Sequence, residues 1–212
     1  MIKKGLMLFI SILFLSACSD NLDASEQNEL KQKLIEVNQI SDIGELNKAL
    51  IDDALSEASQ LDLEGKDKDW FVLYYLIYAT TGEEADKEKA YEHSQLRMLY
   101  EQTWQDLAFE RYGVEIEEDE LQEMLDKYLT PLKEGVLSSQ TSELETQLYL
   151  AEKLGYSVDE YFYQITIHIY ENRVISESLY PLLEKEYGMD DEHGISYQYR
   201  MEVIDEIVEA KS

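Results

Sequence analysis

The sequence contains few cysteines, few prolines and few basic residues. A single cysteine excludes an intramolecular disulfide and a thiolate metal cage. Two prolines, where average usage gives about ten, exclude a collagen-like or proline-rich chain. Only 18 Lys and Arg stand against 46 Asp and Glu, and the formal charge of −28 excludes nucleic acid as a partner, because phosphate binding needs a basic face.

Apolar residues, in contrast, are present in the proportion typical of folded proteins. They make up 44% of the 212 positions, which excludes a disordered tail. This length allows one domain or two small ones.

Residues 1–18 have the pattern of a bacterial lipoprotein signal. Lys3 and Lys4 form a positive start, and the apolar stretch after them is too short to span a bilayer as an ordinary transmembrane helix. The stretch ends in Leu-Ser-Ala-Cys at residues 15–18, where small residues precede the cysteine as in a lipobox. We therefore expect cleavage before Cys18, a diacylglycerol on its thiol and a palmitate on its new amino terminus. The alternative, a buried free cysteine, leaves the position and the preceding charge without explanation.

The expected organisation is a signal peptide at residues 1–17, a lipidated cysteine with a short polar tether at 18–25, and an acidic all-helical domain at 26–212. Cleavage removes two lysines, so 16 bases and 46 acids remain and the mature charge is −30. Anionic lipid head groups repel such a domain, and the tether should hold it off the extracytoplasmic face of the cell membrane.

Helical spacing and helix-capping residues dominate the remaining chain. The expected helices open at Ser25, at the capping box Asp42/Glu45, at Trp70, at the capping box Thr81/Glu84, and at Glu118, Ser142, Ser157 and Ser196. Loops are expected at 61–68 and 134–140, with the preceding helix ending before Pro131. Gly113, Gly155 and Gly188 each precede an apolar residue, which predicts left-handed helix C-caps.

Two apolar segments need separate interpretation. Trp70–Ala79 has no polar break apart from tyrosine hydroxyls, and ten residues are too few to cross a membrane, so we expect a core helix. Residues 163–170 alternate apolar and polar, as in a strand, yet Tyr161, Phe162 and Ile169 also form a helical stripe. A capping box precedes this segment and no turn isolates it, so a buried helix is favoured.

The sequence contains no motif for catalysis. His93, His168 and His193 have no histidine partner three or four residues away, and no H-E-x-x-H, Gly-rich phosphate loop or G-x-S-x-G is present. His168 lies between isoleucines, which indicates a partly buried imidazole rather than a metal ligand. The acid-rich run 115–126 lacks the alternating ligands of an EF-hand, so a solvated acidic face is favoured over a cation site. We expect no enzymatic activity, no metal and no cofactor.

Aromatic residues are the remaining unusual feature, with 16 Tyr, two Trp and five Phe. Core packing explains most of them, and an aromatic-lined cleft for polypeptide would explain the excess of tyrosine. The candidate polypeptide-binding residues are Tyr100, Trp104, Tyr161 and Phe162.

Two segments have a pattern that is more specific than the ordinary end of a helix. In AFERYGVEIEEDEL at residues 108–121, a helix ending in Gly-Val leads through an apolar residue to an acid-rich helix start. In LYLAEKLGYSVDEYF at residues 148–162, a helix closes at a glycine and a Ser-x-x-Glu box opens the next. In order and separation, these segments of residues 90–187 resemble the SurA/PrsA-type extracytoplasmic chaperones.

The resemblance implies an all-helical domain that cradles unfolded or exported polypeptides. Only 24 residues follow Gly188, too few for the parvulin prolyl isomerase module of that family, so isomerase activity is not expected. The leading hypothesis is a lipid-anchored, chaperone-like protein that binds secreted or envelope polypeptides. The alternative is a dedicated interaction lipoprotein with one specific envelope partner, such as an immunity, exclusion or assembly factor.

Overall fold

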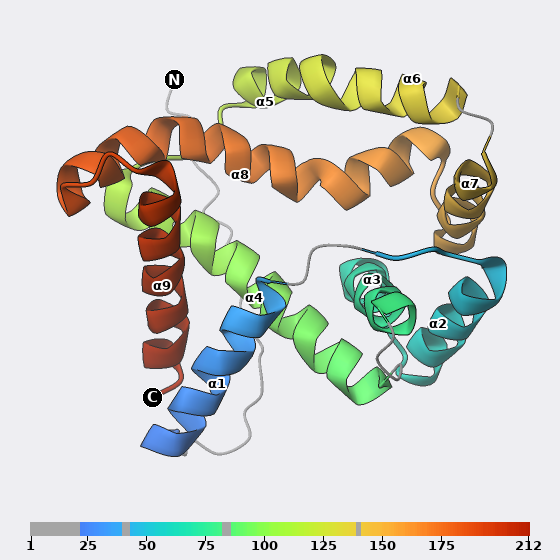
Figure 1. The fold of residues 1–212 in the computed structure, drawn as a ribbon, viewed down its shortest axis with the longest axis horizontal. Coiled ribbons are helices and arrows are strands. Elements are labelled where there is room, and N and C mark those ends of the chain that lie inside the picture. Colours follow the sequence, from blue (N-terminus) through green and yellow to red (C-terminus); the bar gives the residue numbers. More distant parts are fainter. Residues whose placement is uncertain (1–21, 40–42, 82–85, 139–140) are drawn as a thin grey trace, which may run out of the picture.

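The computed structural model describes residues 22–39, 43–81, 86–138 and 141–212. Across these ranges it contains nine α-helices, one π-helical turn and no β-strand, which confirms the predicted all-α, multi-helix fold class. The elements are α1 (Ala24–Val37), α2 (Lys48–Gln60), α3 (Gly65–Thr81), α4 (Lys87–Tyr112), α5 (Glu118–Met124), η1 (Leu125–Leu129), α6 (Thr130–Ser138), α7 (Ser142–Leu154), α8 (Val158–Tyr187) and α9 (Glu192–Ala210) (Figure 1). The predicted signal peptide and Cys18 lie outside the described residues.

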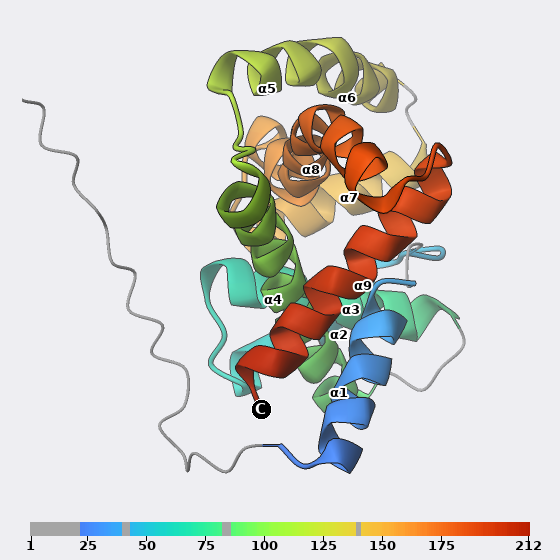
Figure 2. The same ribbon diagram turned by 90° about the vertical axis from the view of Figure 1, so that its left-hand side faces the viewer.

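Two long helices, α4 and α8, connect two apolar lobes. The α3 lobe is the cluster of buried side chains around Phe71 and Leu76, to which α2, α3, η1, α7 and the first half of α8 contribute. The α9 lobe is the cluster around Leu179 and Tyr199, formed by α1, α9 and the second halves of α4 and α8. Leu96 of α4 packs against both clusters. In both ribbon views, α5 and α6 lie along α8 on the side away from α3 (Figures 1 and 2).

The middle of helix α3 is buried on all sides because its sequence there has no polar face. From Phe71 to Tyr78, every side chain except the half-buried Leu73 is buried. The Tyr74 hydroxyl donates to the carbonyl of Val37 (3.1 Å), so a tyrosine can be buried without losing its hydrogen bond. The predicted core helix over 70–79 is confirmed. Among the described residues, no helix is long and apolar enough to cross a lipid bilayer.

The ambiguous segment 163–170 is helical and belongs to α8. The predicted capping box starts this helix: the Glu160 N–H donates to Ser157 Oγ (3.3 Å), and the Ser157 N–H donates to Glu160 Oε2 (2.8 Å). The helix continues past Pro181 as far as Tyr187. The helical stripe, rather than the two-residue alternation, is therefore the correct signal here.

The predicted glycine caps are confirmed. Gly113, Gly155 and Gly188 follow α4, α7 and α8 with φ of 68°, 89° and 65°, which is the left-handed region. The Tyr156 N–H donates to the carbonyl of Ala151 (2.9 Å), which satisfies a carbonyl of the last helical turn.

The predicted start of α2 is wrong. The helix begins at Lys48, where the N-cap Asn47 accepts the N–H of Leu50 (3.1 Å), and Glu45 is not helical. Asp42 lies outside the described residues. The segment before the helix is attached to α3 instead, since the Gly44 N–H donates to Thr80 Oγ1 (2.8 Å).

The predicted cap of α4 is also wrong. Thr81 is the last residue of α3, and its hydroxyl donates to the carbonyl of Ile77 (2.9 Å). The N-cap of α4 is Asp86, which accepts two backbone N–H groups of the first turn. Glu84 lies outside the described residues. An acidic cap closer to the helix therefore replaces the predicted threonine.

The chain does not stop being helical at Pro131. The π-helical turn η1 follows α5, with the Thr130 N–H donating to the Leu125 carbonyl five residues back, and α6 then continues to Ser138. This wider turn shifts the backbone pairing by one residue just before the proline, which has no N–H to pair. The loop predicted at 134–140 is therefore wrong as far as Ser138, and 139–140 lie outside the described residues.

Three helices begin earlier than predicted. Helix α1 begins at Ala24 rather than at Ser25, because Asp23 accepts the N–H groups of Ser25 and Glu26. Helix α3 begins at Gly65, inside the loop expected at 61–68. Helix α9 begins at Glu192 rather than Ser196, because Asp191 accepts the N–H of Gly194 (2.9 Å) and caps the helix there.

Candidate functional site

The four aromatic residues singled out from the sequence are buried and lie in two different lobes. Tyr100 and Trp104 are 6% and 8% exposed in the α9 lobe, while Tyr161 and Phe162 are 5% and 4% exposed in the α3 lobe. The Trp104 ring meets Tyr199 edge-on, with centroids 5.4 Å apart. These residues do not form one shared groove, and only Tyr161 lines an apolar cavity.

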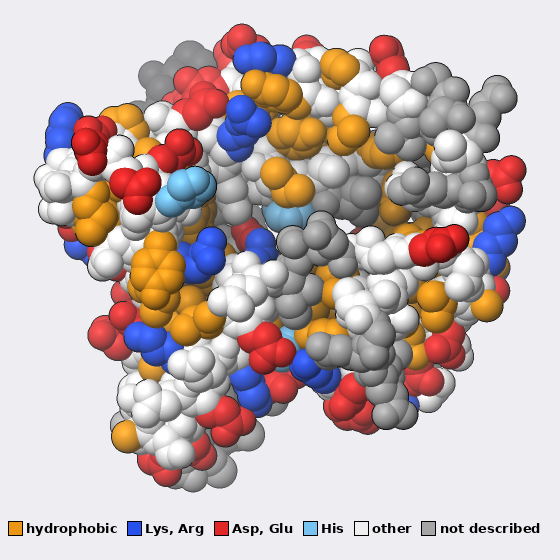
Figure 3. Space-filling view, in the orientation of Figure 1, with side chains coloured by type: hydrophobic (Ala, Val, Ile, Leu, Met, Phe, Trp, Pro, Cys, Tyr) orange, Lys and Arg blue, Asp and Glu red, His pale blue; other side chains and the backbone are white. Residues whose placement is uncertain are grey.

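That apolar cavity, which we call the Trp70 cavity, lies between α3, α7 and α8. Its volume is about 170 Å³. Its lining residues are Ile43, Asp69, Trp70, Val72, Leu73, Leu76, Leu150, Leu154, Tyr161, Gln164 and His168. In the space-filling view, hydrophobic side chains gather along the middle of the face that contains α8, where the surface is hollowed (Figure 3).

Because of helical periodicity, the lining side chains of each helix lie on one face of that helix. On α3 the lining residues recur at intervals of three and four, from Asp69 through Leu73 to Leu76. Leu150 and Leu154 are four apart on α7, and the α8 residues follow the same spacing. Each helix therefore presents one stripe of lining side chains, and the three stripes meet at the cavity.

Polar groups are few and lie at defined places around the cavity. The His168 ring packs against the Trp70 indole, with centroids 5.1 Å apart. The Tyr156 hydroxyl donates to Asp69 Oδ2. An apolar pocket with a small number of convergent polar groups is the usual form of a ligand site.

Burial shifts the titration of these polar groups. Desolvation lowers the pKa of His168 below its usual 6.5, so the imidazole is neutral at pH 7. Burial raises the pKa of Asp69, against the hydrogen bond from Tyr156. Burial also raises the pKa of Tyr161 to about 12. All three shifts are towards the uncharged form, and burial is the largest cause of each.

Sequence reasoning assigned Trp70 to the core and His168 to a partly buried position, and did not connect them. Each stripe is visible in the sequence as a run at helical spacing. The run alone does not show which other helix it faces, so the cavity was not predictable from these stripes.

The buried histidine and the acid-rich run considered from the sequence occupy ordinary structural positions. His93 is buried, and its Nδ1 makes a hydrogen bond with the Tyr78 hydroxyl. The acids Glu118–Glu120 lie in the first turn of α5 and are exposed. Within the ranges that the structure describes, no group of three or more His, Cys, Asp or Glu is placed to hold a metal ion.

Comparison of this chain with protein-family models, with curated proteins and with solved structures finds no match. The resemblance to SurA/PrsA-type chaperones therefore rests on the two segments at 108–121 and 148–162. Their predicted glycine caps and capping box are present, but such caps end and begin helices in many folds. Membership of that family stays a prediction.

Proposed function

We propose that this protein is a lipid-anchored extracytoplasmic protein that binds polypeptide and acts as a chaperone-like factor on secreted or envelope proteins. The observation that supports binding is the Trp70 cavity, an apolar recess that three helices line. The lipobox at Cys18 supports the location, and the absence of a catalytic motif in the sequence supports a non-enzymatic role.

The size of the cavity indicates what it would take. An apolar cavity of about 150 Å³ holds a benzene ring, so 170 Å³ accommodates one aromatic or aliphatic side chain. Fully burying a leucine or phenylalanine side chain stabilises a complex by about 1.5–3 kcal/mol, or about 10- to 150-fold in affinity. The bound polypeptide would therefore insert one anchor side chain, and the acidic surface would attract basic chains to it.

A dedicated interaction lipoprotein is the second candidate. The observation in its favour is that the cavity is small and has polar groups at fixed places, Asp69, Gln164 and His168. Such a site selects one side-chain shape rather than many, as expected for a single envelope partner.

The breadth of binding separates the two candidates. The fragment 19–212 is added to three unrelated chemically unfolded proteins, and their aggregation is followed by light scattering. The chaperone-like function predicts suppression in all three cases. Recovery of one stoichiometric partner from envelope extracts, without any suppression, would favour the dedicated lipoprotein instead.

A pair of variants connects this outcome to the cavity. Leu73→Trp places an indole in the cavity and should abolish suppression. Leu107→Trp makes the same change at another half-buried leucine, on α4 against the α9 lobe, and should leave suppression unchanged. Equal loss in both variants would show that the Trp70 cavity is not the binding site.

The anchor has an independent test. Cells grown with labelled palmitate should label the protein, and Cys18→Ser should remove the label. Incorporation that survives this substitution would contradict the lipobox interpretation.

A further inference from the structure

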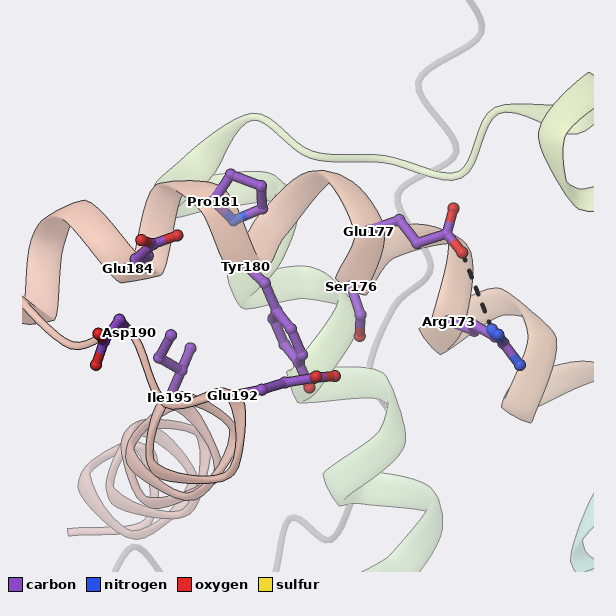
Figure 4. Close-up of a pocket in the computed structure, with 9 residues that line it drawn as sticks. All are labelled: Arg173, Ser176, Glu177, Tyr180, Pro181, Glu184, Asp190, Glu192 and Ile195. Carbon is purple, nitrogen blue, oxygen red and sulfur yellow. Dashed lines mark ion pairs between the residues drawn. The ribbon is translucent and has the colours of Figure 1, made fainter.

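Two adjoining cavities lie between the second half of α8 and the neighbouring helices, and together we call them the α8–α9 cleft. The outer cavity, of about 400 Å³, is bounded by α8 and the first turn of α9 (Figure 4). The inner cavity, of about 220 Å³, is bounded by α4, α8, α9 and the C-terminal end of α1. Ser176 and Tyr180 line both cavities, so the two lie against each other.

The inner end contains two arginines, one of which has no acidic partner. Arg97 is paired with the buried Glu101, so these two charges cancel. Arg200, half-buried on α9, interacts with the hydroxyl of Tyr100 and lines the same cavity. Within the described part of the chain, Arg200 makes no ion pair with a carboxylate. The inner end therefore has one uncompensated positive charge.

This positive charge is unusual for the composition of the protein. The chain contains 46 acidic residues, and the other three arginines, Arg97, Arg111 and Arg173, each pair with a glutamate. A guanidinium is well suited to bind a carboxylate through two parallel hydrogen bonds. An arginine that faces a polar cavity in so acidic a protein is therefore placed for a carboxylate from outside the chain.

The outer end has the opposite charge. Its walls include Glu177, Glu184, Asp190 and Glu192, all exposed, and its one base, Arg173, lies 3.9 Å from Glu177. Figure 4 shows these carboxylates on both sides of the cleft, from α8 and from the start of α9. These exposed carboxylates alone do not define a binding site. Because the outer cavity adjoins the cavity that contains Arg200, the charge changes sign from the outer cavity to the inner one.

The length of the cleft follows from helix geometry. Glu192 and Arg200 are eight residues apart on α9, which corresponds to about 12 Å along the axis of this helix. An extended peptide advances about 3.3–3.6 Å per residue, so three to four residues span this distance. A free amino acid is too short to reach both ends.

We propose that the α8–α9 cleft binds a free peptide of three to four residues, with its carboxylate on Arg200 and its ammonium group among the carboxylates of the outer end. Tyr180 would contact the middle of the peptide, since it lines both cavities. This site is separate from the Trp70 cavity and does not rest on the function proposed above.

The test is a calorimetric titration of the full chain in detergent micelles with tetra-alanine as the probe. Saturable binding is expected, with affinity reduced at least tenfold for the C-terminal amide and for the N-acetyl form. Free alanine should bind at least tenfold more weakly than tetra-alanine. The absence of saturable binding at millimolar tetra-alanine would overturn the proposal, as would equal binding of the amide. Equal binding of the N-acetyl form would overturn the assignment to a free peptide and indicate the C-terminus of a longer chain.

Two arginines of the same cleft provide matched variants. Arg200→Gln should reduce the affinity at least tenfold, whereas Arg173→Gln, which removes the same charge at the acidic end, should leave it equal or increase it. Arg200→Lys keeps the positive charge but lacks the planar guanidinium, so it should give an intermediate affinity. This variant also tests the proposal if Arg200→Gln does not fold. Equal losses in Arg200→Gln and Arg173→Gln would contradict the assigned direction of the peptide.

Discussion

Replacing Glu101 by leucine removes the centre of a polar network that joins three helices. Asn172 Nδ2 of α8 donates to Glu101 Oε2 (2.5 Å), and Arg97 forms the ion pair at the other oxygen. Arg97 Nη1 in turn donates to Asn38 Oδ1 at the end of α1 (2.6 Å). The glutamate is 7% exposed, so its loss leaves partners that cannot turn fully to water.

The structure sets the expected size of this effect. Removing one partner of a buried ion pair costs about 3–5 kcal/mol. The Arg97 side chain is 22% exposed and opens onto the inner cavity, where water can solvate it, so Glu101→Leu should cost about 3 kcal/mol. Arg97→Met leaves a glutamate whose side chain is only 9% exposed, so it should cost about 4 kcal/mol.

The double variant Arg97→Met/Glu101→Leu removes both charges together. Asn38 and Asn172 then each lose a partner, at about 2 kcal/mol apiece, so the double variant should cost about 4 kcal/mol. This is about 3 kcal/mol less than the sum of the single variants, the signature of a direct interaction. As a control, Glu92→Gln removes an exposed partner of Lys33 and should cost less than about 1 kcal/mol.

The assay is urea unfolding of the four variants, followed by far-ultraviolet circular dichroism. In thermal unfolding of the same variants, 3 kcal/mol corresponds to a fall of about 6–12 °C in Tm for a chain of this size. Additive costs in the double variant would refute the coupling. Single-variant costs below about 1 kcal/mol would show that the network is solvated and does not join the helices.

Three further predictions concern stability. Burial lowers the pKa of both His93 and His168; the unfolded chain therefore binds protons below pH 6.5 while the native imidazoles stay neutral, and stability should fall from pH 7.5 to 5.5. His93→Gln should reduce this fall in the urea midpoint, and an unchanged pH dependence would contradict the assignment. Gly155→Ala should cost about 1–2 kcal/mol, because an alanine is strained at φ 89° even though the space around it is open; a cost near zero in urea unfolding would argue against the left-handed cap. Leu179→Ala, at a fully buried position of the α9 lobe, should cost about 2–5 kcal/mol in the same assay, whereas the exposed Leu182→Ala should cost less than about 1 kcal/mol.

The sequence was sufficient to predict the helices whose signals are local. Trp70–Ala79 is a core helix because no polar residue interrupts it, and Ser157 with Glu160 starts α8 because both halves of the capping box lie within one turn. The three glycine caps are local for the same reason. Such features depend only on residues close together in the chain, so a single sequence contains the information they need.

Boundaries that depend on competing caps or on tertiary contacts were not predictable. Asp42 and Asn47 are both good caps, and the contact of Gly44 with Thr80 accompanies the choice of Asn47. Pro131 is a sound signal for a helix end, but the π-helical turn before it allows the chain to continue.

The candidate site shows the same division. The sequence identifies Tyr100 and Tyr161 only by residue type, and residue type alone does not separate a binding groove from a core. The stripes of the Trp70 cavity are local, whereas their meeting requires the packing of α3 against α7 and α8. The α8–α9 cleft depends in the same way on where Arg200 lies relative to the acids of α8.

The most direct test of polypeptide binding uses Trp70 as a reporter inside its own cavity. The chain has two tryptophans, so Trp104→Phe leaves Trp70 as the sole indole and keeps an aromatic ring against Tyr199. The fluorescence of this variant is titrated with an unstructured peptide that contains one phenylalanine, and with the same peptide containing glycine in its place. We predict a saturable spectral shift with the phenylalanine peptide and none with the glycine peptide. No shift with either peptide, or the same shift with both, would contradict binding of an anchor side chain in the Trp70 cavity.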